Sequence, residues 1–202
     1  IYNFSAGPAC LNESVLSVAS EASLEYKDSG MSLLEMSHRS KEIVSLFEET
    51  TENLQSLLSI PSNYKILWLQ GGASLQFPMI PMNLISKGGS ADYIDTGSWS
   101  SKAINECNKL ETAIIIASSS KSNYSFIPKQ FEQNIESNYL HITSNNTIYG
   151  TQYKDYPEVI NPNGFLVADM SSDILSKPIN VSDFGLIYAG AQKNMGPAGV
   201  TL

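Results

Sequence analysis

The chain has 202 residues, of which 42% are hydrophobic and 16% are charged. This composition is typical of a soluble globule with enough apolar side chains for one sizeable core or a tight pair of domains. The formal net charge of −8 argues against nucleic acid or an anionic membrane as a partner. It does not exclude an anionic small substrate, because local groups decide such binding.

The two cysteines, Cys10 and Cys107, are too few and too scattered for a disulfide framework or a metal site. Reduced thiols in a cytoplasmic protein account for them, and no metal is expected. No run of residues approaches the roughly 18 apolar positions of a membrane span, and no charged-then-apolar leader opens the sequence. We therefore expect a cytoplasmic protein without a membrane partner.

The first 60 residues predict an extended arm followed by two helices. The arm covers residues 1–10, and the first helix begins near Asn12, which can cap it, and ends at the turn of residues 28–30. Its apolar side chains gather near one face: Val15, Ala19, Ala22 and Tyr26. Residues 41–60 have the clearest helical period in the chain. The stripe that we expect to face the core consists of Ile43, Phe47, Leu54, Leu57 and Leu58.

Between these helices, His38 and Arg39 occupy a loop or short turn. A planar guanidinium suits bidentate binding of a phosphate. Without further context, an ion pair at the surface is the plainer interpretation of the two residues.

Residues 65–69 are expected to form a strand, and Gln70-Gly-Gly-Ala-Ser74 leads from it into a helix. Glycines let the backbone approach an anion closely, and free N–H groups at a helix N-terminus favour negative charge. The segment therefore predicts either an anion site or a simple strand-to-helix turn.

Four more strands are expected at residues 91–95, 112–117, 139–143 and 165–168. Strands that alternate with helical patterns predict a mostly parallel sheet with right-handed crossovers. Trp99 follows the first of these strands, where packing in the core is its plainer role. Thr147 lies in a turn after the third. The polar stretch of residues 118–138 gives no clear pattern.

An acid and a lysine follow two successive strands near the end of the chain. Asp169 ends the strand at residues 165–168, and Lys193 lies in a turn after a further strand at residues 186–189. In open α/β sheets ligands bind at strand ends, and burial lowers the pKa of a lysine as a Schiff-base lysine requires. A solvated loop lysine is the alternative. The pair suits pyridoxal phosphate, whose aldehyde binds a lysine and whose ring nitrogen is kept protonated by an acid.

With these residues in place, the sequence resembles the phosphoserine aminotransferase family, which belongs to the class V aminotransferases of fold type I. Seven segments carry the resemblance and run in family order from end to end: residues 3–9, 37–41, 70–77, 96–100, 146–150, 169–172 and 188–194. The lysine and His-Arg motifs are specific, whereas the glycine pair alone is weak.

The resemblance implies an α/β fold, a three-layer sandwich around a mostly parallel sheet. Residues 13–202 would form the large cofactor-binding domain, and residues 1–12 an arm that packs on a smaller C-terminal domain. The family continues through that second domain, whereas this sequence stops at Leu202 within what reads as a new strand. We therefore expect a truncated chain.

The resemblance also implies the roles of individual residues. Lys193 would hold pyridoxal phosphate and move a proton, and Asp169 would stabilise the protonated ring. The other cofactor contacts would come from Ala73, Ser74, Trp99, Thr147 and Gln192. His38 and Arg39 would hold the phosphate of the substrate. The family's substrates are glutamate and 3-phosphohydroxypyruvate, and its enzymes are homodimers whose neighbouring subunit completes the cofactor's phosphate site.

Other functions remain open from the sequence. An alanine–glyoxylate-type aminotransferase or a cysteine desulfurase would use the same cofactor chemistry, although neither Cys10 nor Cys107 lies in a desulfurase-like motif. His38 and Arg39 favour a phosphorylated substrate. A truncated, non-catalytic chain that only binds a partner is an alternative of a different class.

Overall fold

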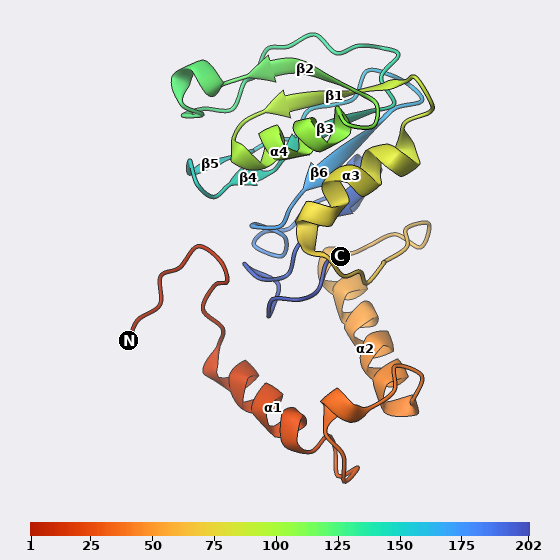
Figure 1. Cartoon of the computed structure of the whole chain (residues 1–202), viewed down its shortest axis with the longest axis vertical. Helices are drawn as coiled ribbons and strands as arrows, with labels where there is room; N and C mark the ends of the chain where they lie inside the picture. The colour runs from red at the N-terminus through yellow and green to blue at the C-terminus, as the bar shows by residue number, and fades with distance from the viewer. The chain divides into compact units, whose positions relative to one another are not determined.

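The computed structural model describes all 202 residues, which divide into two compact units, residues 1–66 and residues 67–202. The first unit contains α1 (Glu13–Leu24), the short 3-10 turn η1 (Leu33–Glu35) and α2 (Lys41–Leu58) (Figure 1). The Asn12 side chain caps α1 by accepting a hydrogen bond from the N–H of Ser14. Ser40 caps α2 in the same way. Both helices therefore start where their capping residues predict.

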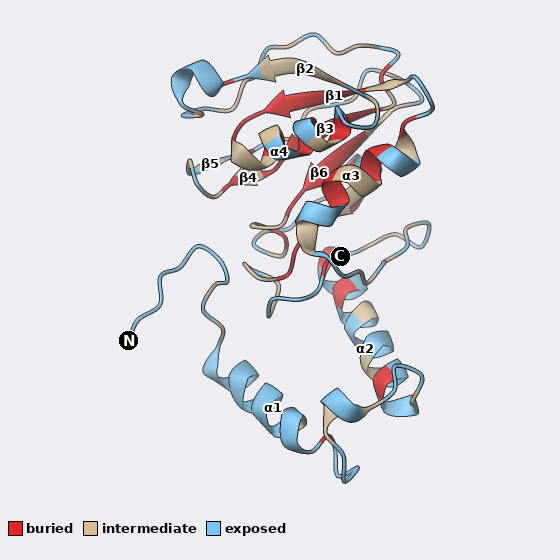
Figure 2. Cartoon of the chain, viewed as in Figure 1, coloured by how far each residue is buried: buried red, intermediate tan, exposed pale blue.

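Burial in the first unit is sparse. No residue of α1 is buried, and in α2 only Ile43, Leu54 and Leu58 are. Figure 2 shows α1 as exposed nearly throughout and α2 with only a few buried positions. The predicted core stripe of α2 is thus wrong at Phe47 and Leu57, which are 46% and 70% exposed. A helical period shows that a helix has an apolar side, but contacts with other elements decide how much of that side is covered.

The second unit is built on a parallel sheet of five strands. They are β1 (Ser90–Asp95), β2 (Thr112–Ser118), β3 (Tyr139–Thr143), β6 (Phe165–Asp169) and β7 (Leu186–Tyr188). Their order across the sheet is β2-β1-β3-β6-β7, and every neighbouring pair is parallel. The predicted α/β fold with a mostly parallel sheet is confirmed.

Two helices cover one face of this sheet, α3 (Gly72–Leu84) and α4 (Ser98–Cys107) (Figure 1). Their side chains share a core cluster with alternate residues of the strands, and the buried members are Phe77, Ile80, Ile85, Ala91, Tyr93, Ala103, Ile104, Cys107, Tyr139, Val167 and Tyr188. The intervening strand residues, such as Leu140, Ile142 and Leu166, are buried as well. A parallel sheet buried on both faces explains why its strands read as nearly continuous apolar runs.

The sequence left residues 118–138 unplaced. Ser118 ends β2, and residues 119–138 connect β2 to β3 with only a 3-10 turn, η2 (Ser120–Ser122). A buried carboxylate on β1 fixes this connection: Asp92 accepts hydrogen bonds from the backbone N–H of Asn134 at 2.7 Å and from the Ser137 hydroxyl at 2.6 Å. Side-chain anchoring replaces the helical crossover that is usual between parallel strands.

The strand predicted at residues 65–69 is not formed. Residues 65–68 have no regular structure, and only Leu69 pairs, through an antiparallel bridge to Thr201. Thr201 also bridges to Gly190. A strand requires a continuous partner, which Thr201 alone does not provide.

A small hairpin lies between β3 and β6. Its strands are β4 (Asn145–Asn146) and β5 (Thr151–Gln152), paired antiparallel.

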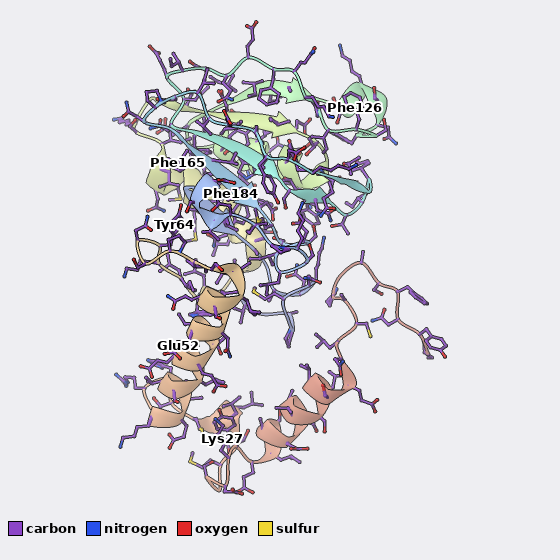
Figure 3. All side chains as sticks on the ribbon, turned by 180° about the vertical axis from the view of Figure 1, so that it is seen from behind. Lys27, Glu52, Tyr64, Phe126, Phe165 and Phe184 are labelled. Carbon is purple, nitrogen blue, oxygen red and sulfur yellow. The ribbon has the colours of Figure 1, made fainter.

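The connection between β6 and β7 contains η3 (Val181–Asp183) and then Phe184, which is buried. Phe165, Phe184 and Phe126 belong to the second unit, whereas Lys27 and Glu52 belong to the first (Figure 3). None of the helices combines the length and the apolar character that crossing a membrane requires.

Candidate active site

The carboxyl ends of the parallel strands meet at one edge of the sheet, and a cavity of about 110 Å³ lies there. Its lining comes from α3, α4, the last residues of β3 and β6, and the segments that follow β3, β6 and β7: Gly72, Ala73, Ser74, Phe77, Trp99, Thr143, Asn145, Asp169, Ser171, Ser172, Gln192 and Lys193. This edge is where open α/β sheets bind ligands. A cavity that holds one water molecule needs only about 10–15 Å³, so this cavity has room for a ring-sized group.

Lys193 lies in the turn after β7 and is half-buried. The turn is closed by a hydrogen bond from the N–H of Gly196 to the carbonyl of Ala191. The Lys193 ammonium donates to the Thr147 hydroxyl at 2.5 Å. Burial lowers the pKa of Lys193, and the nearby Asp169 carboxylate opposes this shift. The position therefore favours a neutral amine more than a solvated loop would.

Asp169 ends β6 and is 5% exposed. Its Oδ1 accepts two hydrogen bonds from Ser171, from the N–H at 3.0 Å and from the hydroxyl at 2.6 Å. Burial raises the pKa of Asp169, the Ser171 bonds and the charge of Lys193 lower it, and Asp173 raises it further. No ion pair joins Asp169 to Lys193, because the structure's only ion pair links Lys109 and Glu106. A buried carboxylate without an ion-pair partner favours a cation in the cavity.

The N-terminus of α3 opens on the same cavity. Gly71 and Gly72 have φ angles of +90° and +65°, which only glycine adopts readily. A Cβ on Gly71 would lie 2.5 Å from the Leu75 side chain. No side chain caps the helix, so the first N–H groups of α3, including those of Ala73 and Ser74, have no partner within the helix. Such a helix end attracts anions.

Trp99 lies in the first turn of α4 and forms part of the cavity lining. The Lys193 ammonium is 5.6 Å from the centroid of the indole ring, and Lys102 approaches the ring at 4.4 Å. The start of α4 is fixed by Ser100, whose hydroxyl accepts from the N–H groups of Thr96 and Gly97 and donates to Asp95. An aromatic face is thereby held beside the amine.

The structure brings most of the predicted site residues together. Ala73, Ser74, Trp99, Asp169, Gln192 and Lys193 line one cavity, and Thr147 joins them through its hydrogen bond to Lys193. The sequence missed other lining residues, among them Phe77, Thr143, Asn145, Ser171 and Ser172. Ser171 and Ser172 could have been found, because they directly follow Asp169 at the strand end.

His38 and Arg39 belong to the first unit. Both are exposed, and neither forms an ion pair, so the structure does not support the alternative of a surface ion pair. His38 borders an open groove along α2 together with Val44, Phe47, Glu48, Thr51 and Glu52. Their predicted role toward a substrate stays a prediction.

A half-buried amine, a buried carboxylate, an aromatic side chain and a helix N-terminus lie together at the carboxyl edge of a parallel sheet, the edge at which α/β folds bind ligands. The model of the class-V aminotransferase family matches residues 1–202. The chain belongs to the class-V aminotransferases.

Individual relatives narrow the comparison. The phosphoserine aminotransferase of Alkalihalobacillus alcalophilus is 51% identical over 204 aligned residues, which cover 100% of this chain and 56% of the relative. A solved structure described as radiation damage of the Schiff base in phosphoserine aminotransferase has a TM-score of 0.95 at 51% identity, with the same coverage. The enzyme of Trichomonas vaginalis with bound PLP has a TM-score of 0.91 at 38% identity, covering 99% of this chain and 56% of that one.

The predicted resemblance is thus confirmed over the whole chain. The chain spans about half the length of the relatives it matches.

Proposed function

We propose that the complete protein is a pyridoxal-phosphate-dependent aminotransferase that transfers the amino group of glutamate to 3-phosphohydroxypyruvate, forming phosphoserine and 2-oxoglutarate in serine biosynthesis. One observation carries the proposal: Lys193 and Asp169, from the ends of neighbouring strands, face one cavity together with a free helix N-terminus. Similarity to phosphoserine aminotransferases over the whole chain supports the choice of substrates.

The residues present fit the cofactor. Asp169 is a buried carboxylate without a cationic partner at ion-pair distance, and a protonated pyridine nitrogen would supply that partner. The uncapped start of α3, at Ala73 and Ser74, would bind the phosphate. Trp99 would stack on the ring, and Thr147 and Gln192 would contact its polar edge. Lys193 would bind the aldehyde carbon.

When bound, pyridoxal phosphate supplies an electron sink for the bonds at the substrate's α-carbon. The chain's own residues prepare that chemistry. The lowered pKa of Lys193 makes its Nζ able to bind carbon and, once free, to accept the proton from the substrate's α-carbon. Asp169 keeps its negative charge next to a cation, which stabilises a protonated ring nitrogen.

Three further parts of the proposal extend beyond the cavity. His38 and Arg39 bind the phosphate of the keto acid, for which a guanidinium is suited. Residues 1–12 form an arm, residues 13–202 the large domain, and the arm packs on a smaller domain of the complete protein. That protein is a cytoplasmic homodimer with composite active sites. Similarity to the family supports these parts.

The test uses the complete protein with added pyridoxal phosphate. Absorbance above about 300 nm reports the bound cofactor. A second assay measures the formation of phosphoserine from glutamate and 3-phosphohydroxypyruvate. We expect a new absorbance band and turnover. Cofactor binding with turnover of only unphosphorylated keto acids would retain the aminotransferase and reject the substrate. A protein that binds no cofactor would refute the proposal altogether.

A further inference from the structure

A second carboxylate, Asp173, lies four positions after Asp169 in the same turn and has no role so far. It is 6% exposed. No cation lies at ion-pair distance, because the structure's only ion pair is elsewhere, between Lys109 and Glu106. A buried carboxylate without a counter-charge is costly unless hydrogen bonds to its oxygens compensate. The hydrogen-bond partners of Asp173 therefore indicate its role in the structure.

Both oxygens of Asp173 bind the base of the β4–β5 hairpin. Oδ1 accepts from the Ser144 hydroxyl at 2.5 Å, and Oδ2 accepts from the Gln152 side-chain amide at 3.0 Å. Ser144 precedes β4 directly, and Gln152 is the last residue of β5. The two partners thus stand on opposite strands of the hairpin, and one carboxylate holds both.

The hairpin needs such support. It has only two residue pairs, Asn145 with Gln152 and Asn146 with Thr151, and even a full two-stranded hairpin is marginally stable in water. The neighbouring Ser172 adds a second attachment through its hydroxyl, which donates to the carbonyl of Asn145 at 2.9 Å. The turn after β6 therefore grips the hairpin at adjacent points.

The tip of this hairpin carries Thr147, whose hydroxyl accepts from Lys193 at 2.5 Å. The turn that holds the base begins at Asp169. We propose that Asp173 is a positioning residue, which clamps the β4–β5 hairpin to the end of β6 and so fixes Thr147 relative to Lys193 and Asp169. Asp173 acts through Ser144 and Gln152 and does not line the cavity.

Two substitutions of Asp173 separate the effect of its two hydrogen bonds from the effect of its negative charge. Asp173→Asn can keep both contacts, because its carbonyl oxygen can accept from Ser144 while its amide donates to a rotated Gln152 side chain. Asp173→Ala removes both. We would compare them by hydrogen exchange in the complete protein without added cofactor, at the amides of Gly150 and Tyr153. Both amides are bonded within the hairpin region, to Asn146 and Ser144 respectively.

Asp173→Ala should accelerate exchange at these amides by about tenfold or more, the effect of losing a charge-assisted hydrogen bond. Asp173→Asn should stay within about threefold of the unaltered protein, and amides of β1 should not change in either variant. Unchanged exchange in Asp173→Ala would overturn the proposal, as would equal acceleration across the sheet. If Asp173→Ala does not fold, Gln152→Ala decides, because the Gln152 amide donates to Asp173: it must accelerate exchange at the hairpin alone, and no local acceleration rejects the clamp.

A second measurement rests on the proposed function. Asp173→Ala should weaken binding of pyridoxal phosphate by about tenfold, because Thr147 is no longer held. Asp173→Asn should bind it nearly as tightly as the unaltered protein. If the unaltered protein binds no cofactor, the proposed function fails while the exchange result still decides the clamp. If it binds and Asp173→Ala binds equally well, the hairpin is clamped without positioning Thr147, and the proposal is wrong.

Discussion

The two units of the chain place their apolar side chains in opposite ways. In the first unit α1 buries no residue, although Val15, Leu16 and Val18 are apolar. In the second, the five-residue strand β3 is buried throughout, and α3 buries Phe77 and Ile80. Figure 2 shows the contrast between the exposed α1 and the buried strands β1, β3 and β6. Apolar residues stabilise a fold only where other elements cover them.

Because of this difference, we expect the two units to contribute differently to stability and to function. The second unit contains both the core and the cavity with Lys193 and Asp169. The first unit contains His38 and Arg39, which are exposed side chains. Changes in the second unit should therefore alter stability and chemistry strongly. Changes in the first should alter little except the recognition that we propose for Arg39.

The largest effect is expected at Lys193. In the complete protein, Lys193→Ala should abolish the absorbance of covalently held cofactor and lower kcat by at least about 10⁴-fold, because one residue is both the reactive amine and the proton carrier. The fold should remain, as judged by circular dichroism. Lys65→Ala, which removes an exposed lysine of the first unit, is the matched control and should keep normal activity. Near-normal transamination by Lys193→Ala would refute its assignment.

A change in the core of the second unit should also have a large effect, in this case on the free energy of unfolding. Ile142 lies in β3 and is 0% exposed, so Ile142→Ala removes buried methyl groups and leaves a cavity. The free energy of unfolding should fall by about 2–5 kcal/mol. Leu57→Ala is its counterpart in the first unit. Because Leu57 is 70% exposed, the loss there should be within about 0.5 kcal/mol.

Denaturant titration of both variants measures this contrast. Equal losses for Ile142→Ala and Leu57→Ala would show that the first unit buries Leu57 in solution, and would contradict the comparison between the units.

The same contrast explains what could be read from the sequence. The strand at residues 139–143 was predicted with both of its ends correct, because it is short, apolar and buried on both faces. The prediction failed at residues 65–69, where the partner strand is missing, and at Phe47 and Leu57, which are 46% and 70% exposed. Local pattern shows what a segment can form, whereas its partners far along the chain decide whether it pairs or is buried.

The candidate site divides in a similar way. Lys193 and Asp169 could be predicted, because strand ends of a parallel sheet meet at one edge. The Asp173 clamp could not, because Ser144 and Gln152 reach it only through the folded hairpin. Asp92, which anchors the connection before β3, has the same character. Buried carboxylates that bind hydroxyl and amide groups leave no periodic signal in a sequence.

The buried histidine of the second unit offers a pH test of its core. His141 on β3 is buried, and burial lowers its pKa to about 3 from an ordinary 6.5. The unfolded chain therefore binds a proton below pH 6.5 that the folded chain refuses, so stability is lost as the pH falls from 6.5 toward 3. At pH 4.5 this loss should be about 2.7 kcal/mol, two units at 1.36 kcal/mol each.

Unfolding by denaturant at pH 7 and pH 4.5 measures that loss. In His141→Gln, whose amide can still bond to the Tyr188 hydroxyl as His141 does at 2.9 Å, the dependence on pH should become smaller by about this amount. An unchanged slope in His141→Gln would show that His141 is not held neutral.

The smallest of these effects tests whether the first unit takes part in function. Arg39 is exposed and forms no ion pair, so Arg39→Ala should leave the free energy of unfolding nearly unchanged. If Arg39 binds the phosphate of the substrate, the variant should raise KM for 3-phosphohydroxypyruvate by about tenfold or more, since a charge-assisted hydrogen bond contributes about 1.5–3 kcal/mol. Affinity for pyridoxal phosphate should barely change, because its proposed phosphate site is the start of α3.

Steady-state kinetics in the complete protein with glutamate and the keto acid varied separately distinguishes this role from a general one. Arg39→Lys is the matched variant: it keeps the charge but loses the planar fork, and should fall between Arg39→Ala and the unaltered protein. An equal rise in KM for glutamate and for the phosphorylated keto acid would reject the phosphate role. A large loss of stability in Arg39→Ala would instead show that this exposed side chain supports the fold, and the division between the two units would no longer hold.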